Sequence, residues 1–316
     1  MGSRSAVVAC VPTVVAELIA GGDPLPDAVE LMVWDGHGSA PGRGPDIDVW
    51  VPPFLWSPDG LDDVLAALPR LRVIQLTSAG YEQYADRVPP GAVLCNGRGI
   101  HGGSTSEWVL AAMLASLRRI PEFVRAQDER AWEHDLGTDE LAGKRVLIVG
   151  AGDLGENTAT RVRAFDAEPV LVASTARGGV HGVEELPDLL PDADVVVLVL
   201  PLTDRTAGLV DAQFLARMRD GALLVNGARG PIVDTGALLV ELSAGRLRAA
   251  LDVTDPEPLP PEHPLWTAPN LVLTPHVGGS VPGYPARAAA LVANQLSRFA
   301  AGECLTNVVV EGPLRR

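Results

Sequence analysis

Val146-Leu-Ile-Val-Gly150-Ala-Gly152-Asp-Leu-Gly155 is the stretch that decides the fold of this chain. A β-branched run leads directly into three glycines spaced as GxGxxG, and a helical stretch, 154–165, follows them. Gly150 permits a tight turn, Gly152 lets the backbone approach a pyrophosphate, and Gly155 lets helix and strand pack closely. The helix N-terminus offers free N–H groups and the positive end of its dipole to phosphates. The stretch therefore predicts the first strand, turn and helix of a dinucleotide-binding domain.

Short apolar runs alternate with helical stretches on both sides of this turn. After it, the expected strands are Pro169–Val172, Asp194–Leu200, Ala222–Val225, Arg248–Val253 and Leu271–Thr274. Before it, they are Ala6–Val11, Glu30–Trp34, Asp48–Val51, Arg72–Leu76 and Ala92–Cys95, with a helix at Asp62–Leu68 and a final helix at Arg287–Ala301. Such alternation predicts α/β architecture with parallel sheets and crossover helices.

The composition limits the classes of function. A chain of 316 residues is long enough for two domains. A net charge of −15 argues against a nucleic-acid partner, which would need a basic surface. No apolar run reaches the roughly 18 residues of a membrane span, and no secretory signal is evident. Three scattered cysteines without metal-ligand spacing indicate a reducing cytoplasm and no metal site.

The strand after the glycine turn carries a clue to the dinucleotide. An NAD site usually has an acid about 20 residues after the turn, bonded to the ribose 2′-hydroxyl. The stretch 170–177 has no acid and offers Ser174, Thr175 and Arg177, which suit a 2′-phosphate. The pattern favours NADP(H), with NAD(H) as the alternative.

Three further residues suggest the chemistry. Arg229 lies in NGARGPIVD after an expected strand, Glu257 lies in DPEPLP, and His276 lies in TPHVGG. An arginine can hold a carboxylate, a histidine can donate and accept a proton, and a glutamate can favour the charged imidazole. Taken singly, each has a structural explanation, as a surface ion pair, a solvated loop acid or a core histidine. In this order the trio predicts hydride and proton transfer to a 2-oxo acid.

Together these motifs resemble the D-isomer-specific 2-hydroxyacid dehydrogenases, which include glyoxylate/hydroxypyruvate reductases and phosphoglycerate dehydrogenases. The similarity covers essentially the whole chain and adds Leu200-Pro-Leu-Thr203, Leu251-Asp-Val253 and Pro256-Glu-Pro258 to the motifs above. It implies two doubly wound parallel-sheet domains. A discontinuous flavodoxin-like substrate domain would comprise 1–101 and 283–316, and a Rossmann cofactor domain would comprise 102–282.

The resemblance also implies the roles of individual residues. Arg229, Glu257 and His276 would be catalytic, and Ser78, Ala79 and Gly80 would bind the substrate carboxylate together with Arg229. The cofactor-binding set would be Gly150, Gly152, Asp153, Leu154, Gly155, Ser174, Thr175, Arg177, Pro201, Thr206, Ala228 and Asp252. The apolar helix Trp108–Leu117, opened by a capping box at Ser104–Glu107, would contribute to a homodimer interface.

Two rival functions stay open at this point. One is a formate- or phosphite-type dehydrogenase, although Leu76–Gly80 lacks the lysine that phosphite enzymes use. The other is a dinucleotide-sensing corepressor of the same fold. For a 2-oxo acid, the apolar segment Trp50–Trp56, flanked by Tyr81 and Tyr284, predicts an uncharged side chain, because neither 48–57 nor 77–84 contains a cation for a phosphate.

Overall fold

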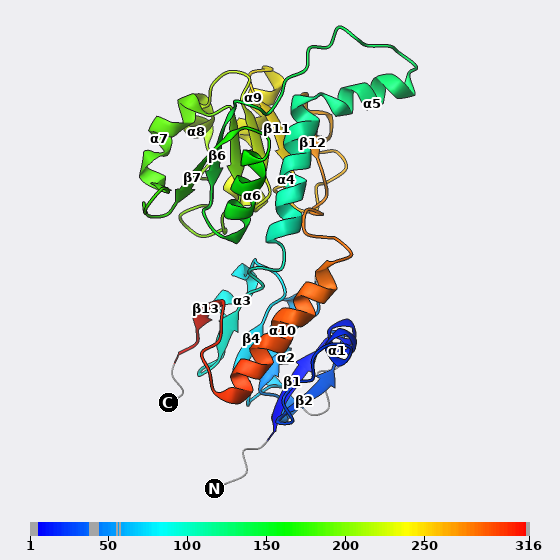
Figure 1. Cartoon of the computed structure of the whole chain (residues 1–316), viewed down its shortest axis with the longest axis vertical. Helices are drawn as coiled ribbons and strands as arrows, with labels where there is room; N and C mark the ends of the chain where they lie inside the picture. The colour runs from blue at the N-terminus through cyan, green and yellow to red at the C-terminus, as the bar shows by residue number, and fades with distance from the viewer. Residues whose placement is uncertain (1–5, 38–43, 55, 57, 314–316) are drawn as a thin grey trace. The chain divides into compact units, whose positions relative to one another are not determined.

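The computed structural model describes residues 6–37, 44–54, 56 and 58–313. The chain divides into two compact units (Figure 1). Unit 1 comprises Met1–His101 and Pro282–Arg316, and unit 2 comprises Gly102–Val281. The sequence analysis places these boundaries after residues 101 and 282, and the structure divides after residues 101 and 281.

Unit 2 is built on a parallel sheet of seven strands. The strands are β6 (Arg145–Val149), β7 (Glu168–Ala173), β8 (His181–Gly182), β9 (Val195–Leu198), β10 (Leu223–Asn226), β11 (Arg248–Leu251) and β12 (Leu271–Leu273). Their order is β12-β11-β10-β9-β6-β7-β8, so the direction of winding reverses between β6 and β9. This order is that of a doubly wound dinucleotide-binding sheet, as predicted.

Helices cover both faces of this sheet (Figure 1). They are α4 (Gly102–Leu117), α6 (Asp153–Arg163), α7 (Leu186–Leu189), α8 (Ala212–Arg217) and α9 (Thr235–Ser243), with short 3₁₀ turns at Val183–Glu185, Leu190–Asp192, Gly230–Ile232 and Pro264–Thr267. Helix α5 (Ile120–Asp128) follows α4 and extends away from the sheet (Figure 1). Side chains of each strand alternate between two cores: Val146 and Ile148 pack with α4 and α6, whereas Leu147 and Val149 pack with α7, α8 and α9. Each fully buried aliphatic side chain contributes about 1.5–3 kcal/mol to folding.

The start of α4 differs from the sequence prediction. The helix begins at Gly102, so Ser104 and Glu107 lie within its first turns and do not form a capping box ahead of it. The first residue of α4 lies close to the carboxylate of Asp153 on α6. Glycine fits there because a Cβ at position 102 would collide with that carboxylate. The apolar character of α4 is explained within unit 2, since it packs against α6 and against the β10–β12 side of the sheet.

Unit 1 has a six-stranded sheet. Its strands are β1 (Val7–Val11), β2 (Val29–Val33), β3 (Val49–Trp50), β4 (Val73–Gln75), β5 (Val93–Cys95) and β13 (Val308–Glu311), in the order β13-β5-β4-β3-β1-β2. The helices are α1 (Thr13–Ala20), α2 (Leu61–Ala66), α3 (Glu82–Ala85) and α10 (Tyr284–Ala301), with 3₁₀ turns at Gly44–Asp46 and Pro58–Gly60. The five parallel strands have flavodoxin-like order, which confirms the predicted fold class.

Two edge strands were not predicted. β13 joins β5 antiparallel through the last residues of the described chain, and β8 joins β7 over only two residues. Helix α10 packs beside α1 on one face of the unit 1 sheet, so the C-terminal segment completes the core that residues 7–95 begin (Figure 1). The discontinuity of unit 1 therefore has a packing reason.

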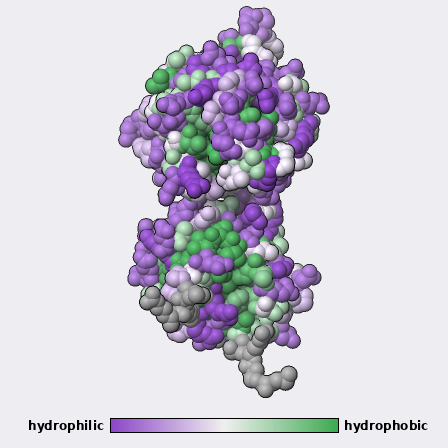
Figure 2. All heavy atoms as spheres, turned by 90° about the vertical axis from the view of Figure 1, so that its left-hand side faces the viewer, coloured by the Kyte–Doolittle hydropathy of each residue, from purple (hydrophilic) through white to green (hydrophobic). Residues whose placement is uncertain are grey.

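The surface differs in hydropathy between the two units. Figure 2 shows hydrophilic atoms over most of unit 2 on the side of α7, and hydrophobic atoms gathered near the middle of unit 1 on the side of β13. Among the described helices, none combines the length and the apolar character that crossing a membrane requires.

Candidate active site

The glycine turn joins β6 to α6 at the carboxyl edge of the unit 2 sheet. Gly150 has φ +119°, and an added Cβ would collide with the carbonyl oxygen of Val199. A Cβ on Gly155 would collide with the carbonyl oxygen of Gly150, so helix and turn are as close as the spacing predicts. At Gly152 an added Cβ meets nothing within 4 Å. Two glycines thus serve packing, while the third faces open space beside the first N–H groups of α6, where a pyrophosphate fits.

The end of β7 lies beside this turn. Ser174 and Thr175 are exposed just after the strand, and Arg177 reaches back so that its Nη2 donates to the carbonyl oxygen of Ala151, 2.8 Å away. The arginine cation is therefore held between the strand end and the glycine turn. The structure therefore brings these three predicted residues next to the glycine turn.

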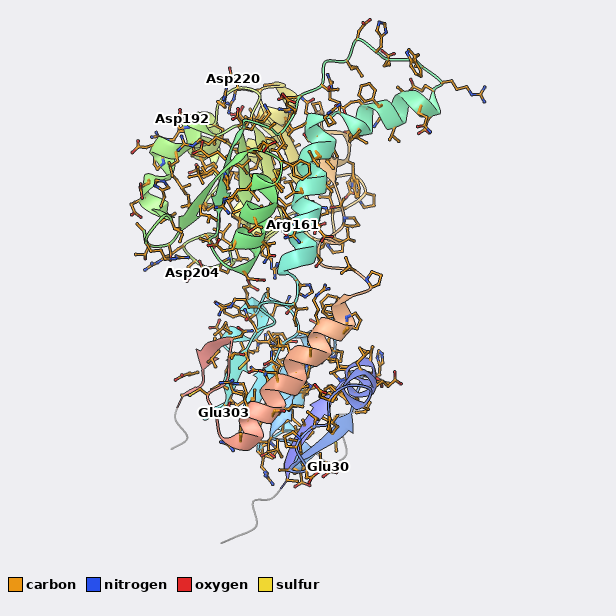
Figure 3. All side chains as sticks on the ribbon, in the orientation of Figure 1. Glu30, Arg161, Asp192, Asp204, Asp220 and Glu303 are labelled. Carbon is orange, nitrogen blue, oxygen red and sulfur yellow. The ribbon has the colours of Figure 1, made fainter. Side chains whose placement is uncertain are left out.

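The loop after β9 lies at the same edge of the sheet. Figure 3 shows Asp204 at this end of unit 2, and Asp192 and Asp220 at the opposite end. Within the loop, Thr206 Oγ1 donates to the carbonyl oxygen of Pro201 at 2.7 Å and accepts from the Thr203 N–H at 2.8 Å. Thr206 therefore shapes the loop through its own side chain.

Arg229 follows β10 and is half-buried. The backbone around it is fixed by Asn226, whose Nδ2 donates to the Arg229 carbonyl oxygen at 3.0 Å and whose Oδ1 accepts from the Ala228 N–H at 3.0 Å. Arg229 Nη1 donates to the Ala228 carbonyl oxygen at 2.7 Å. Gly230 lies so close to Thr254 that a Cβ would collide with the carbonyl oxygen of that residue. This packing fixes the loop of Arg229 against the segment that leads to Glu257.

His276 and Glu257 form the pair that the sequence predicts. Nδ1 of His276 lies 2.7 Å from Oε1 of Glu257, and the two side chains are 45% and 42% exposed. His276 has φ +54°, a left-handed conformation that is uncommon for residues other than glycine but that histidine adopts more often than most. Its N–H donates to the Asp252 carbonyl oxygen at 2.7 Å, which fixes this turn. In the described part of the chain, Nε2 of His276 has no hydrogen-bond partner.

The carboxylate of Asp252 contacts the loop that carries His276. Its carboxylate is buried, with 4% exposure, and accepts from Thr274 Oγ1 at 2.6 Å, from the Val277 N–H at 2.9 Å and from the Gly278 N–H at 2.8 Å. All of these contacts are with the loop that carries His276. A second brace, which the sequence analysis misses, is Trp108, whose Nε1 donates to Thr274 Oγ1 at 2.9 Å.

The predicted substrate loop, Thr77–Gly80, follows β4 in unit 1. Each of its carbonyl oxygens accepts a hydrogen bond from another group of unit 1, as detailed below. By contrast, the N–H groups of Ser78, Ala79 and Gly80 find no acceptor among the described residues. Successive backbone N–H groups in a turn can donate to a bound anion. The three N–H groups of Ser78, Ala79 and Gly80 are called the nest below.

Aromatic rings gather next to this loop. The rings of Tyr284, Phe54 and His101 form a cluster, with centroids 4.3 Å apart for Tyr284 and Phe54, 5.1 Å for Tyr284 and His101, and 5.9 Å for Phe54 and His101. Tyr284 also donates its hydroxyl to Thr77 Oγ1 at 2.6 Å, and burial raises the pKa of that hydroxyl to about 12. Tyr284 and the apolar segment around Phe54 are singled out by the sequence, whereas the contribution of His101 to the ring cluster is seen only in the structure.

The described residues contain no cluster of three or more histidine, cysteine, aspartate or glutamate side chains suited to a metal ion. A family model described as the NAD binding domain of D-isomer specific 2-hydroxyacid dehydrogenase matches residues 110–278. This chain belongs to that family. The resemblance seen in the motifs is thereby confirmed.

Relatives within the family differ in length. Glyoxylate reductase of Aeropyrum pernix is 33% identical over 316 residues, covering 90% of this chain and 92% of that protein. D-3-phosphoglycerate dehydrogenase of Mycobacterium bovis is 36% identical over 259 residues, which cover 79% of this chain. The aligned part is 49% of the mycobacterial protein, so the match spans about half of that longer enzyme.

Solved 2-hydroxyacid dehydrogenase structures share the fold. The D-isomer specific 2-hydroxyacid dehydrogenase of Xanthobacter autotrophicus Py2, in complex with NADPH and MES, superposes with a TM-score of 0.82 at 31% identity. The match covers 97% of this chain and 98% of that chain. Membership of this family establishes unit 2 as a nicotinamide-dinucleotide-binding domain.

Proposed function

We propose that this chain reduces a 2-oxo acid to the D-2-hydroxy acid with a nicotinamide dinucleotide, and catalyses the reverse oxidation. The observation that carries the proposal is the His276–Glu257 pair, 2.7 Å from Nδ1 to Oε1, on the same edge of the sheet as the glycine turn. A histidine held at one ring nitrogen by a carboxylate is oriented for proton transfer at the other. Family membership supports the assignment.

The bound dinucleotide supplies hydride chemistry, and the residues of the chain supply binding and proton transfer. His276 donates a proton from Nε2 to the oxygen of the ketone as that oxygen gains negative charge, and accepts it again in the oxidative direction. Glu257 holds Nδ1 and stabilises the imidazolium. Arg229 offers a cation that pairs with the substrate carboxylate and polarises the neighbouring carbonyl.

The nest at Ser78, Ala79 and Gly80 is the second candidate for holding the substrate carboxylate. Three N–H groups without acceptors among the described residues can donate to its oxygens. Their role, like those of Arg229 and of the cofactor-binding residues named above, is part of this proposal.

NADP(H) is the preferred dinucleotide in this proposal. The support is the Arg177 guanidinium, which is held at the glycine turn by Ala151, together with the exposed hydroxyls of Ser174 and Thr175 and the absence of an acid from 170–177. A 2′-phosphate there gains charge-assisted hydrogen bonds that a 2′-hydroxyl does not. NAD(H) is the alternative.

The proposed substrate has an uncharged side chain. Trp50 is fully buried and packs against Trp34 and Trp56, with centroids 6.3 Å and 5.6 Å apart, so it serves the core. Phe54 is 37% exposed and available for contact. The described residues of 48–56 and of 77–84 include no lysine or arginine for a phosphate. Leu55 and Ser57, on which the sequence argument also draws, lie outside the described residues.

A panel of 2-oxo acids with NADH and NADPH tests the activity, followed by the absorbance of the reduced nicotinamide. We expect turnover of glyoxylate, hydroxypyruvate, 2-oxoisocaproate or phenylpyruvate above that of phosphohydroxypyruvate, and a loss of about 10²–10⁴-fold in kcat in His276→Ala. Preference for the phosphorylated acid would overturn the substrate class. Reduction of NAD⁺ or NADP⁺ by formate or phosphite in a parallel assay, without turnover of any 2-oxo acid, would favour the first rival. Dinucleotide binding without any turnover would favour the corepressor.

A homodimer is proposed on α5 and the segment that follows it, 129–139, which extend away from the rest of unit 2 (Figure 1). Ile120, Val124 and Trp132 are 48%, 51% and 93% exposed, an apolar set that a second copy could cover. Light scattering of the parent and of Trp132→Glu tests this arrangement. A parent monomer, or a dimer unaffected by Trp132→Glu, would contradict it.

The cytoplasm is the proposed location. The support is that Cys10, Cys95 and Cys304 are all free thiols, which suits a reducing compartment. Fractionation of the source cells with an antibody against the chain would test it.

A further inference from the structure

The anion nest owes its shape to the partners of its carbonyl groups. The Thr77 carbonyl oxygen accepts from His101 Nε2 at 3.1 Å, that of Ser78 accepts from the Gly97 N–H at 2.6 Å, and that of Ala79 accepts from Asn96 Nδ2 at 2.8 Å. With the carbonyl groups turned towards unit 1, the N–H groups of the same peptides point the other way. The loop after β5, 96–101, therefore fixes the orientation of the nest, because it donates hydrogen bonds to the carbonyl oxygens of the same peptides.

Asn96 is the side chain that holds the centre of the nest. It is 9% exposed, and it uses both ends of its amide: Nδ2 donates to the Ala79 carbonyl oxygen, and Oδ1 accepts from the Arg98 N–H at 3.2 Å. The next residue is Gly97, and glycine is needed there because any Cβ would lie only 2.6 Å from the Thr77 carbonyl group. Side chain and glycine together bring the two loops into contact.

A buried relay of amides fixes Asn96 in turn. Gln75 Nε2 donates to the Asn96 carbonyl oxygen at 3.2 Å, and Gln75 Oε1 accepts from Gln295 Nε2 at 2.8 Å. Gln295, on α10, accepts from both the N–H and the Oγ1 of Thr306 at 3.0 Å. The Asn96 N–H donates to the Asn307 carbonyl oxygen at 3.0 Å. The two glutamines are 1% and 3% exposed, so these bonds are made away from water and are costly to break.

We propose that Asn96 is a positioning residue for the substrate carboxylate: it orients the N–H groups of Ser78, Ala79 and Gly80 and is itself held by the C-terminal segment through Gln75 and Gln295. Its amide touches neither substrate nor cofactor and acts through the Ala79 carbonyl group. The inference rests on the proposed function, because it assigns an anion to the nest. It predicts an effect on carboxylate affinity with little effect on the chemical step.

Two substitutions of Asn96 separate this role from general stability. Asn96→Ala removes the donor to Ala79 and should raise KM for the 2-oxo acid about 5- to 20-fold, with kcat within about threefold of the parent. N96D keeps the shape and the acceptor for Arg98, but its ionised carboxyl repels the Ala79 carbonyl oxygen. Protonation at low pH returns an O–H donor. The KM penalty of N96D should therefore shrink as pH falls through the pKa of the introduced carboxyl, which burial and the neighbouring Ala79 carbonyl oxygen raise, while that of N96A stays constant.

Ser297→Ala is the matched control. Ser297 Oγ donates to the Ala293 carbonyl oxygen at 2.9 Å within α10 and makes no hydrogen bond to 77–80 or 96–101. Removing this bond should leave KM at the parent value. Parent KM values in both N96A and N96D would overturn the inference. So would an N96D penalty that is independent of pH.

Binding of oxalate, measured by calorimetry with the dinucleotide-saturated protein, separates failure of the inference from failure of the proposed function. If the parent turns over no 2-oxo acid but binds oxalate more tightly than N96A does, the inference holds and the catalytic proposal fails. If the parent is active and all variants bind oxalate equally, the positioning role is refuted while the activity stands.

Discussion

Replacing Asp252 by asparagine tests how the active-site loop is held. The carboxylate accepts three hydrogen bonds from 274–278 and is 4% exposed. An asparagine offers one carbonyl oxygen and one NH₂ group. Because all three partners are hydrogen-bond donors, the NH₂ group must face one of them and can form no hydrogen bond with it. The less costly orientation keeps the oxygen towards Thr274 and Val277 and turns the NH₂ towards the Gly278 N–H.

The magnitude follows from that orientation. One hydrogen bond to a charged group, worth about 1.5–3 kcal/mol, is lost, and a buried N–H is left without an acceptor at a further cost of about 1–3 kcal/mol. Relief from burying a charge offsets part of this sum. A net loss of about 2–4 kcal/mol in the free energy of unfolding of unit 2 is expected, with Tm lower by roughly 5–10 °C. Because the loop carries His276, kcat should fall by about 10- to 100-fold.

Urea unfolding followed by fluorescence, together with steady-state kinetics, measures both effects. Asp211→Asn is the matched control in the same unit: Asp211 caps α8 through one hydrogen bond to the Phe214 N–H, a task that asparagine performs equally well. Its cost should stay below about 0.5 kcal/mol. If D252N matches the parent in stability and kcat, the carboxylate does not brace the loop and this account of the site is wrong.

Three further outcomes are expected. Glu257→Gln should lower kcat for 2-oxo acid reduction by about 10- to 100-fold, because Nδ1 of His276 loses the carboxylate 2.7 Å away that orients the ring; a kcat equal to that of the parent and of the exposed control Glu262→Gln would exclude this role. Arg177→Ala should raise KM for NADPH at least 10-fold while leaving KM for NADH within about twofold, since only the 2′-phosphate loses a cation; equal changes for both cofactors would argue against it. Burial raises the pKa of both Tyr84 and Tyr284 from 10.0 to about 12, so the folded state retains protons that the unfolded state releases. The free energy of unfolding should therefore be unaffected by these groups below about pH 10 and should decline as pH rises towards 12. A variant with both tyrosines replaced by phenylalanine should show a smaller decline in urea titrations at several pH values.

Local sequence was sufficient for the framework of both units. Strand runs such as 146–149 and 195–198 are apolar at every position because parallel strands are covered on both faces, and this pattern is legible without coordinates. The glycine turn was equally legible, because close backbone packing excludes a Cβ at Gly150 and Gly155 whatever the rest of the chain does. The pairing of His276 with Glu257 came from motifs, and the structure brings the two side chains together.

Other features depended on contacts between distant residues. The strand β13 is short and adds its hydrogen bonds to β5 across more than 200 positions, so no local period marks it. The start of α4 at Gly102 was missed because the serine and glutamate that resemble a cap are a local signal, whereas the helix boundary is set by packing against Asp153.

The roles of single polar side chains were the least accessible from sequence. The sequence alone does not show that the carboxylate oxygens of Asp252 accept hydrogen bonds from residues 274–278. Nor does it show that the side-chain amide of Asn96 lies 2.8 Å from the Ala79 carbonyl oxygen. Sequence determines which groups can donate or accept. Only the fold determines which of them meet away from water, because a hydrogen bond between buried groups requires two loops far apart in the chain to be held within about 3 Å.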